Sequence, residues 1–184
     1  MKYKTIVIDP AWDLKLLSKS ATKYMQGGSV ATKLPYHTMK DKELLDFPVA
    51  DFADTNCNLF LWCINSKLEF AFRLLHEWNF KYSTMLVWAK SNGITMLGIN
   101  YKTEYCLFAY QGKRELANSK NPIPTHFSFP RGKHSEKPKE FYDMILKKSP
   151  APRIDIFARR RHYGFDAYGD QVESEPTTLE AYHG

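Results

Sequence analysis

Apolar and polar residues follow one another along the chain in blocks that predict strands separated by helices. Short apolar runs rich in β-branched and aromatic residues occur at 5–8, 58–63, 82–90, 103–111 and 153–159, and each is typical of a β-strand. Several runs are apolar almost throughout, as expected for strands covered on both faces. The pattern predicts an α/β sandwich with a largely parallel sheet.

Three segments between these strands show helical spacing. Apolar residues recur every three or four positions in each of them, and Ser66 and Glu69 stand at the spacing of a capping box. The predicted helices, each with the residue expected to cap it, are 39–47 with Thr38, 66–80 with Ser66 and 136–148 with Ser135.

Two long segments between the predicted elements, 13–37 and 112–134, carry Gly, Ser, Pro and Lys. Loops of this length in a compact domain are usually functional lids or disordered segments. We expect one domain over residues 1–172 and a flexible acidic tail over 173–184. Because no apolar run approaches the roughly 20 residues that span a bilayer, we expect no membrane association.

The balance of charges favours a polyanionic partner. The 184 residues carry a formal net charge of +6, and the basic residues gather between 131 and 161. A basic surface of this kind indicates nucleic acid, although a modest positive charge also serves solubility alone. The three cysteines, Cys57, Cys63 and Cys106, form no CxxC pair. We therefore expect free thiols and a cytoplasmic protein, without a metal site.

The first predicted strand ends in the tetrapeptide Asp9-Pro10-Ala11-Trp12. In an open α/β sheet, ligands bind beyond the carboxyl ends of the strands. A carboxylate, a carbonyl left free by proline and an exposed indole together suit a flat ligand that carries an amine. The alternative is a turn that ends the strand, with Trp12 folded back into the core.

A second group of polar residues lies near the end of the chain. Asp155 falls within a predicted strand and Arg159 lies at its end, and carboxylates in such places often bind ribose hydroxyls. Asp170 and Gln171 add hydrogen-bonding groups. The chain has no GxxxxGK[ST], GxGxxG, HExxH or GxSxG motif, so the sequence gives kinases, metalloproteases and serine hydrolases little support.

These segments together resemble the adenine-N(6) methyltransferases, the family that includes the catalytic subunit of the eukaryotic messenger-RNA methyltransferase. The family's Asp-Pro-Pro-Trp motif here reads DPAW, and LPYHTM, LFLWC, LVWAK, KHSEKPKEFYDMI and IFARRRHYGFDAYGDQ follow in the family's order. The resemblance covers about residues 3–172. It implies a Rossmann-like methyltransferase sandwich in permuted order, with the catalytic motif before the cofactor motifs, and S-adenosylmethionine as cofactor.

The resemblance also implies roles for individual residues. Asp9 and the Pro10 carbonyl would bind the target amine, and Trp12 would stack on adenine. The residues implied on the substrate side are Ala11, Tyr36, Arg131 and Lys133, and those implied on the cofactor side are Ile8, Asp9, Lys137, Asp155, Arg159, Asp170 and Gln171. Two positions depart from the family pattern: Ala11 replaces the second proline, and Asp170 replaces an asparagine.

The implied activity is methyl transfer to the exocyclic amine of adenine in nucleic acid, with DNA favoured over RNA and a homo- or heterodimer expected. An adenine must leave its base stack to enter such a pocket. Two rivals stay open: an inactive or weakly active nucleic-acid-binding subunit that partners an active enzyme, and methylation of a small molecule or protein on the same fold.

Overall fold

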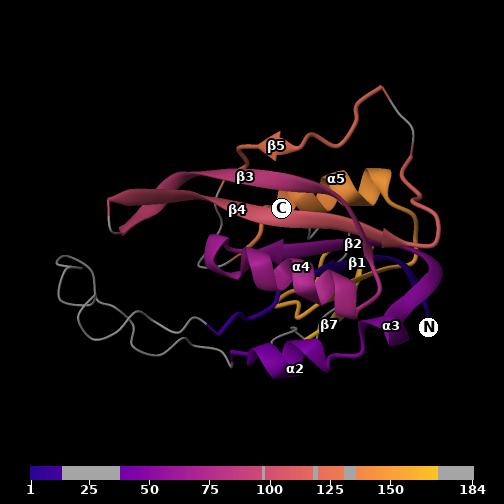
Figure 1. Ribbon diagram of the computed structural model, residues 1–184. Coiled ribbons are helices and arrows are strands. Elements are labelled where there is room, and N and C mark those ends of the chain that lie inside the picture. Colours follow the sequence, from indigo (N-terminus) through magenta and orange to yellow (C-terminus); the bar gives the residue numbers. More distant parts are fainter. Residues whose placement is uncertain (14–37, 97, 118–119, 131–135, 170–184) are drawn as a thin grey trace.

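A mixed β-sheet forms the centre of the protein. The computed structural model describes residues 1–13, 38–96, 98–117, 120–130 and 136–169 (Figure 1). Within these residues the sheet has seven strands in the order β5-β3-β4-β2-β1-β6-β7. The strands are β1 (Tyr3–Ile8), β2 (Ala53–Cys63), β3 (Lys81–Met96), β4 (Ile99–Gln111), β5 (His126–Phe127), β6 (Arg153–Ile156) and β7 (Asp166–Tyr168).

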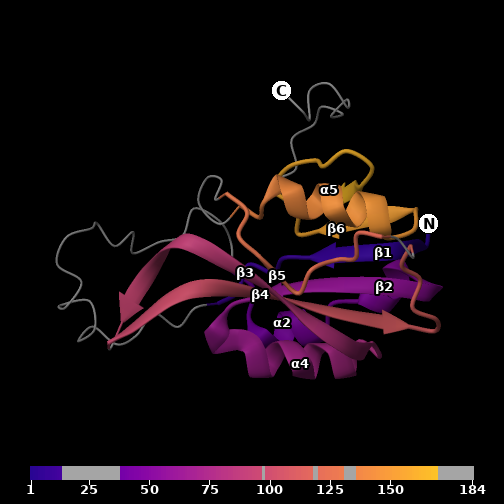
Figure 2. The ribbon, with the colours of Figure 1, turned by 90° about the horizontal axis from the view of Figure 1, so that it is seen from above.

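Helices cover both faces of this sheet, which gives the three layers of Figure 2. The first face carries α2 (Asp41–Leu45), α3 (Val49–Phe52) and α4 (Leu68–Glu77), and the second carries α5 (Lys139–Lys148). The predicted α/β sandwich is confirmed. Among the described residues, no helix is long and apolar enough to cross a lipid bilayer.

The strand pairings are more varied than the predicted, largely parallel sheet. Parallel pairing joins β1 to β2 and β6, β6 to β7, and β3 to β5. In contrast, β4 is antiparallel to both of its neighbours. The reason is a tight turn at Gly98, whose φ of 79° suits glycine. Because β3 and β4 are joined by a turn and not by a crossover helix, they form a hairpin.

The three predicted helices exist, but their caps differ. Glu43 of α2 accepts a hydrogen bond from the Lys40 backbone at 2.7 Å, so Lys40 and not Thr38 is the N-cap residue of that helix. Ser66 lies in a 3₁₀ turn, Asn65–Lys67, and α4 starts after Lys67 without a side-chain cap. The predicted cap Ser135 is outside the described residues.

Apolar side chains of the strands supply a core on each face. Leu59 and Leu61 of β2 pack with α4, whereas Phe60 and Trp62 face α5, and all four are fully buried. This alternation explains the continuous apolar run in the sequence, because both faces of β2 are covered.

The end of β1 lies where the connections between strands change from one face of the sheet to the other. β1 lies between β2 and β6, and the chain reaches β2 through α2 and α3 on one face but reaches β6 through α5 on the other. Such a reversal is a topological switch point, and ligands of α/β proteins bind outside the carboxyl ends of the strands there. Asp9 directly follows β1 at this point.

Candidate active site

Asp9 is held at the carboxyl edge of the sheet by both backbone and side chain. Its amide donates a 3.5 Å hydrogen bond to the carbonyl of Ile156, at the end of the neighbouring strand. Its carboxylate Oδ2 accepts a 2.7 Å hydrogen bond from Lys137 Nζ. The side chain of Asp9 is 18% exposed and that of Lys137 is 8% exposed. The structure therefore joins two predicted site residues that lie far apart in the sequence.

Lys137 contacts a second carboxylate, which the sequence analysis missed. Glu104 Oε2 lies 3.4 Å from Lys137 Nζ, and Glu104 Oε1 accepts a 2.7 Å hydrogen bond from Lys90. We call this row the ion chain: Lys90, Glu104, Lys137 and Asp9. Glu104 and Lys90 are each 17% exposed. The ion chain thus runs from the base of the β3–β4 hairpin to Asp9, with two positive and two negative members.

Aromatic rings support the ion chain from the α5 side of the sheet. Lys137 Nζ lies 5.4 Å from the centre of the Trp62 ring, and Lys90 Nζ lies 5.9 Å from that of Trp88. A cation over an aromatic face is stabilised by the ring quadrupole, more so where water is excluded. The two tryptophans therefore help to hold both lysines at the edge of the sheet.

Burial and pairing act in opposite directions on the pKa values of the ion chain. Burial raises the pKa of Asp9 above its ordinary value, although Lys137 and Arg159 oppose the change. Burial also disfavours the Lys137 ammonium, but Asp9 and Glu104 outweigh it and raise that pKa. For Glu104, burial is outweighed by Lys137 and Lys90, which lower its pKa. Lys137 and Glu104 are therefore charged at neutral pH.

Trp12 does not present an exposed face in this structure. The indole is 7% exposed and packs edge-on against Phe70, with ring centres 6.4 Å apart. Its backbone forms an isolated bridge with Met39. The expectation of an exposed indole is wrong, and the alternative reading, a tryptophan folded into the core, describes the structure. Stacking on adenine stays a prediction that requires Trp12 to turn outward.

The two residues between Asp9 and Trp12 use their carbonyls within the protein. The Pro10 carbonyl accepts a 2.8 Å hydrogen bond from the Trp12 amide, and the Ala11 carbonyl accepts one of 2.8 Å from the Met39 amide. A carbonyl oxygen has two lone pairs, so Pro10 retains one for a ligand. The predicted role of Pro10 as second acceptor is compatible with this geometry and stays a prediction.

Asp155 lies in β6 as predicted, but its side chain enters the layer under α5. It is 3% exposed, and its Oδ2 accepts a 3.0 Å hydrogen bond from Tyr142 Oη. Burial raises the pKa of Asp155 to about 8, which leaves the carboxyl group protonated at neutral pH. His162 stacks on Tyr142 with ring centres 3.4 Å apart, and burial lowers its pKa to about 3. The predicted contact of Asp155 with ribose stays a prediction.

The remaining predicted residues divide between described and undescribed parts of the chain. Ile8 is fully buried at the end of β1. Arg159 follows the end of β6, whose Ile156 carbonyl accepts the hydrogen bond from the Asp9 amide, and its positive charge opposes the rise in the pKa of Asp9. The residues outside the described ranges are Tyr36, Arg131, Lys133, Asp170 and Gln171.

Comparisons with known proteins show the family of this chain. A family model described as MT-A70 matches residues 3–171. The chain belongs to the MT-A70 family. This result confirms the resemblance on which the site was predicted. MT-A70 methyltransferases use S-adenosylmethionine as methyl donor, so the predicted cofactor and class of enzyme are confirmed as well.

Two curated relatives illustrate the range of this MT-A70 family. The type II methyltransferase M.MunI of a Mycoplasma species is 30% identical over 182 residues, which cover 93% of this chain and 78% of that protein. The human N(6)-adenosine-methyltransferase catalytic subunit METTL3 is 26% identical over 167 residues, which cover 86% of this chain and 26% of METTL3. The chain thus corresponds to most of M.MunI and to about a quarter of METTL3.

The charges at the switch point fit the family's cofactor. S-adenosylmethionine carries a carboxylate, an ammonium group and a sulfonium, so a site for it needs both anionic and cationic partners. Asp9, Lys137 and Arg159 provide them at one edge of the sheet. The charges of these three residues therefore match those of S-adenosylmethionine.

Proposed function

We propose that this protein transfers a methyl group from S-adenosylmethionine to the exocyclic N(6) amine of adenine in nucleic acid. The observation that carries the proposal is the carboxylate of Asp9, which follows β1 at the switch point and accepts a hydrogen bond from Lys137. Membership of the MT-A70 family supplies the reaction class, and M.MunI and METTL3 are named methyltransferases, METTL3 of adenosine N(6).

The adenine amine is a poor nucleophile because its lone pair is conjugated with the ring. Asp9 accepts a hydrogen bond from the amine, and the second lone pair of the Pro10 carbonyl accepts the other hydrogen. These bonds direct the nitrogen lone pair toward the methyl group and stabilise the positive charge that grows on nitrogen. Positioning of this kind lowers the barrier without a strong base. When bound, S-adenosylmethionine supplies an electrophilic methyl group on sulfur.

The cofactor is held by residues around the same edge. Lys137 would lie near its methionine part, while Ile8 and Asp9 line the place where β1 ends. Asp155 and Arg159 are the candidates for ribose contacts, and Asp170 and Gln171 for contacts with ribose and adenine. Asp155 would serve the ribose as a neutral, protonated acid, since its pKa is raised to about 8.

The proposal of a nucleic-acid substrate is supported by the charge of the chain and by residues outside the described ranges. Tyr36, Arg131 and Lys133 would contact it, and the net charge of +6 favours a polyanion. We favour DNA over RNA, since the chain corresponds to most of M.MunI, a type II methyltransferase. A homo- or heterodimer remains part of the proposal, as does a cytoplasmic location, with which the three free, buried cysteines agree.

Ala11 supports a second candidate function. An alanine in the motif relaxes the backbone of the catalytic segment compared with two prolines. A weakly active or inactive subunit that binds nucleic acid for an active partner would tolerate this change. Such a subunit need not bind S-adenosylmethionine, so calorimetric titration with the cofactor separates the two functions.

Methyl transfer to matched polymers tests the proposal. The purified chain is incubated with labelled S-adenosylmethionine and one sequence offered as single- and double-stranded DNA and RNA. Digestion and mass spectrometry then identify the methylated nucleoside. We expect N(6)-methyladenine, with the larger yield in DNA. Label in protein or in another base, or cofactor binding without transfer, would contradict the proposal.

A further inference from the structure

Lys137 is hydrogen-bonded to the carboxylate that the proposed reaction needs. Its ammonium lies 2.7 Å from Asp9 Oδ2, the carboxylate that is to bind the adenine amine. In the transition state the amine nitrogen gains positive charge, and a fixed ammonium on the same carboxylate opposes that charge. Lys137 must therefore weaken its bond to Asp9 when adenine enters. Since its side chain is only 8% exposed, it cannot simply move into water.

Glu104 provides a second position for this ammonium. Its Oε2 is already 3.4 Å from Lys137 Nζ, so a shift of less than the length of one bond shortens this ion pair to hydrogen-bond distance. Its other oxygen is fixed by Lys90 at 2.7 Å, which holds the carboxylate in place on the β3–β4 hairpin. The pKa of Glu104 is lowered by these lysines, in keeping with a charged acceptor.

We propose that Glu104 is a positioning residue that receives Lys137 when adenine binds and so releases Asp9 to the target amine. This inference rests on the proposed function. No proton moves in the exchange: Lys137 stays an ammonium, and one ion pair weakens as the other strengthens. The ring of Trp62, 5.4 Å from the ammonium, stabilises the charge in both positions. Glu104 therefore acts on the reaction through Lys137.

Steady-state kinetics of Glu104→Gln test this inference. The amide keeps the size of the side chain but removes its charge, so Lys137 stays on Asp9. We expect kcat to fall between about tenfold and hundredfold, while calorimetry shows unchanged affinity for S-adenosylmethionine. Glu104→Asp keeps the charge and should recover part of the loss. Glu115→Gln, which changes a carboxylate that follows the far end of β4 and lies beside Asn56, should keep the wild-type kcat.

A Lys137→Met background separates this role from a structural one. If Glu104 acts through Lys137, adding Glu104→Gln to Lys137→Met changes kcat less than about twofold, because the partner is already absent. Equal effects of Glu104→Gln in both backgrounds would overturn the inference, and so would a wild-type kcat in Glu104→Gln. If Glu104→Gln fails to fold, Glu104→Asp decides by the same cycle. A wild-type chain that methylates no adenine overturns the proposed function and this inference with it.

Discussion

Asp155→Asn should change how the stability of the protein depends on pH. The native carboxyl group is 3% exposed, and burial raises its pKa from an ordinary value of 3.8 to about 8. Above about pH 4 the unfolded chain releases this proton, but the folded chain keeps it until about pH 8. The unfolded state therefore binds fewer protons in this window, and Asp155 makes the free energy of unfolding fall as pH rises.

The magnitude follows from the linkage relation. Each pH unit in the window lowers the free energy of unfolding by about 1.4 kcal/mol, so the change between pH 4 and pH 7 is about 4 kcal/mol. Asparagine cannot ionise, so Asp155→Asn removes this slope. The amide brings an extra buried N–H, which costs about 1–3 kcal/mol at every pH. The mutant is therefore less stable than wild type at pH 4. Between pH 4 and pH 7 its free energy of unfolding rises relative to that of wild type by about 4 kcal/mol.

Urea unfolding followed by circular dichroism at several pH values measures this difference. Subtracting the wild-type curve from the mutant curve cancels every other titrating group. A flat curve for Asp155→Asn would refute a protonated Asp155 at neutral pH.

Two further changes test the core and the ion chain. Trp12→Ala should lower the free energy of unfolding by about 3–5 kcal/mol, because it removes a buried indole packed on Phe70; an unchanged melting temperature would contradict the buried position. Lys137→Met should cost about 3–5 kcal/mol at pH 8, because it leaves the carboxylates of Asp9 and Glu104 without their shared cation. Loss of the cation raises the pKa of both carboxyl groups. The loss of stability should therefore become smaller as pH falls, because the two groups become protonated. A loss of stability that does not depend on pH would argue against the pairing.

Much of the fold could be predicted from local patterns. The apolar runs at 58–63 and 153–159 fall on β2 and β6, and α4 has its apolar residues on one face, so hydrophobic patterns located these elements. The direction of β4 could not be predicted in this way. It depends on one turn at Gly98, and the residues on either side of that turn continue strands where a parallel sheet would need a helix.

The candidate site shows a similar division. Asp9 could be predicted because a carboxylate directly follows an apolar strand. Glu104 could not, because a single acidic residue near the start of a strand usually lies in water, and its partners Lys90 and Lys137 come from other elements. Trp12 was placed wrongly for a related reason. Its burial depends on Phe70 of α4, a contact that no local pattern contains.

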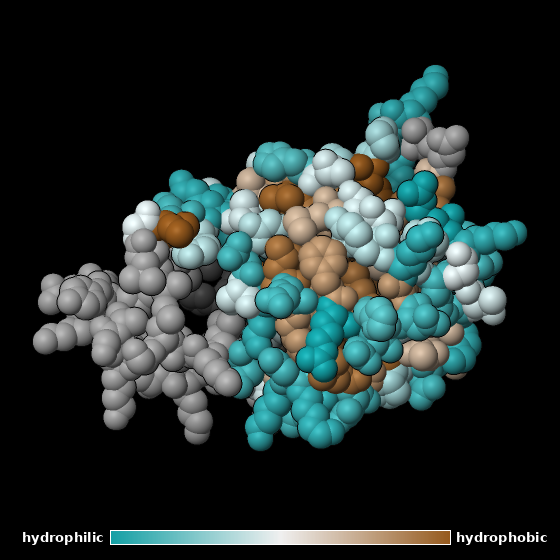
Figure 3. All heavy atoms as spheres, in the orientation of Figure 1, coloured by the Kyte–Doolittle hydropathy of each residue, from teal (hydrophilic) through white to brown (hydrophobic). Residues whose placement is uncertain are grey.

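The apolar surface over α4 is a further feature that only the structure shows. Figure 3 shows apolar atoms gathered in the middle of this face. Phe72 of α4 contacts Tyr82 of β3, with ring centres 5.0 Å apart, and both are partly exposed.

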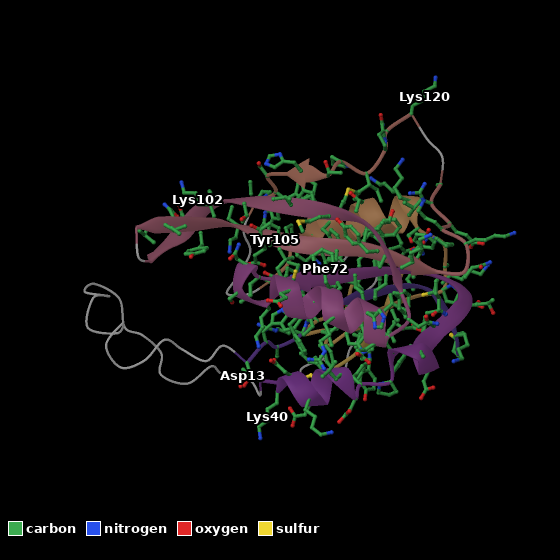
Figure 4. All side chains as sticks on the ribbon, in the orientation of Figure 1. Asp13, Lys40, Phe72, Lys102, Tyr105 and Lys120 are labelled. Carbon is green, nitrogen blue, oxygen red and sulfur yellow. The ribbon has the colours of Figure 1, made fainter. Side chains whose placement is uncertain are left out.

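Lys102 lies further out along the hairpin than Tyr105 (Figure 4). The hairpin therefore extends past the edge of the sheet where Asp9 lies.

The rate of methyl transfer by Asp9→Ala is the most direct test of the central claim. The assay uses an adenine-containing oligonucleotide that wild type methylates, with Asp51→Ala as a control on the exposed side of α3. We predict that Asp9→Ala folds and loses at least about a hundredfold to a thousandfold in kcat, while Asp51→Ala keeps the wild-type rate. Undiminished turnover by a folded Asp9→Ala variant would contradict the account.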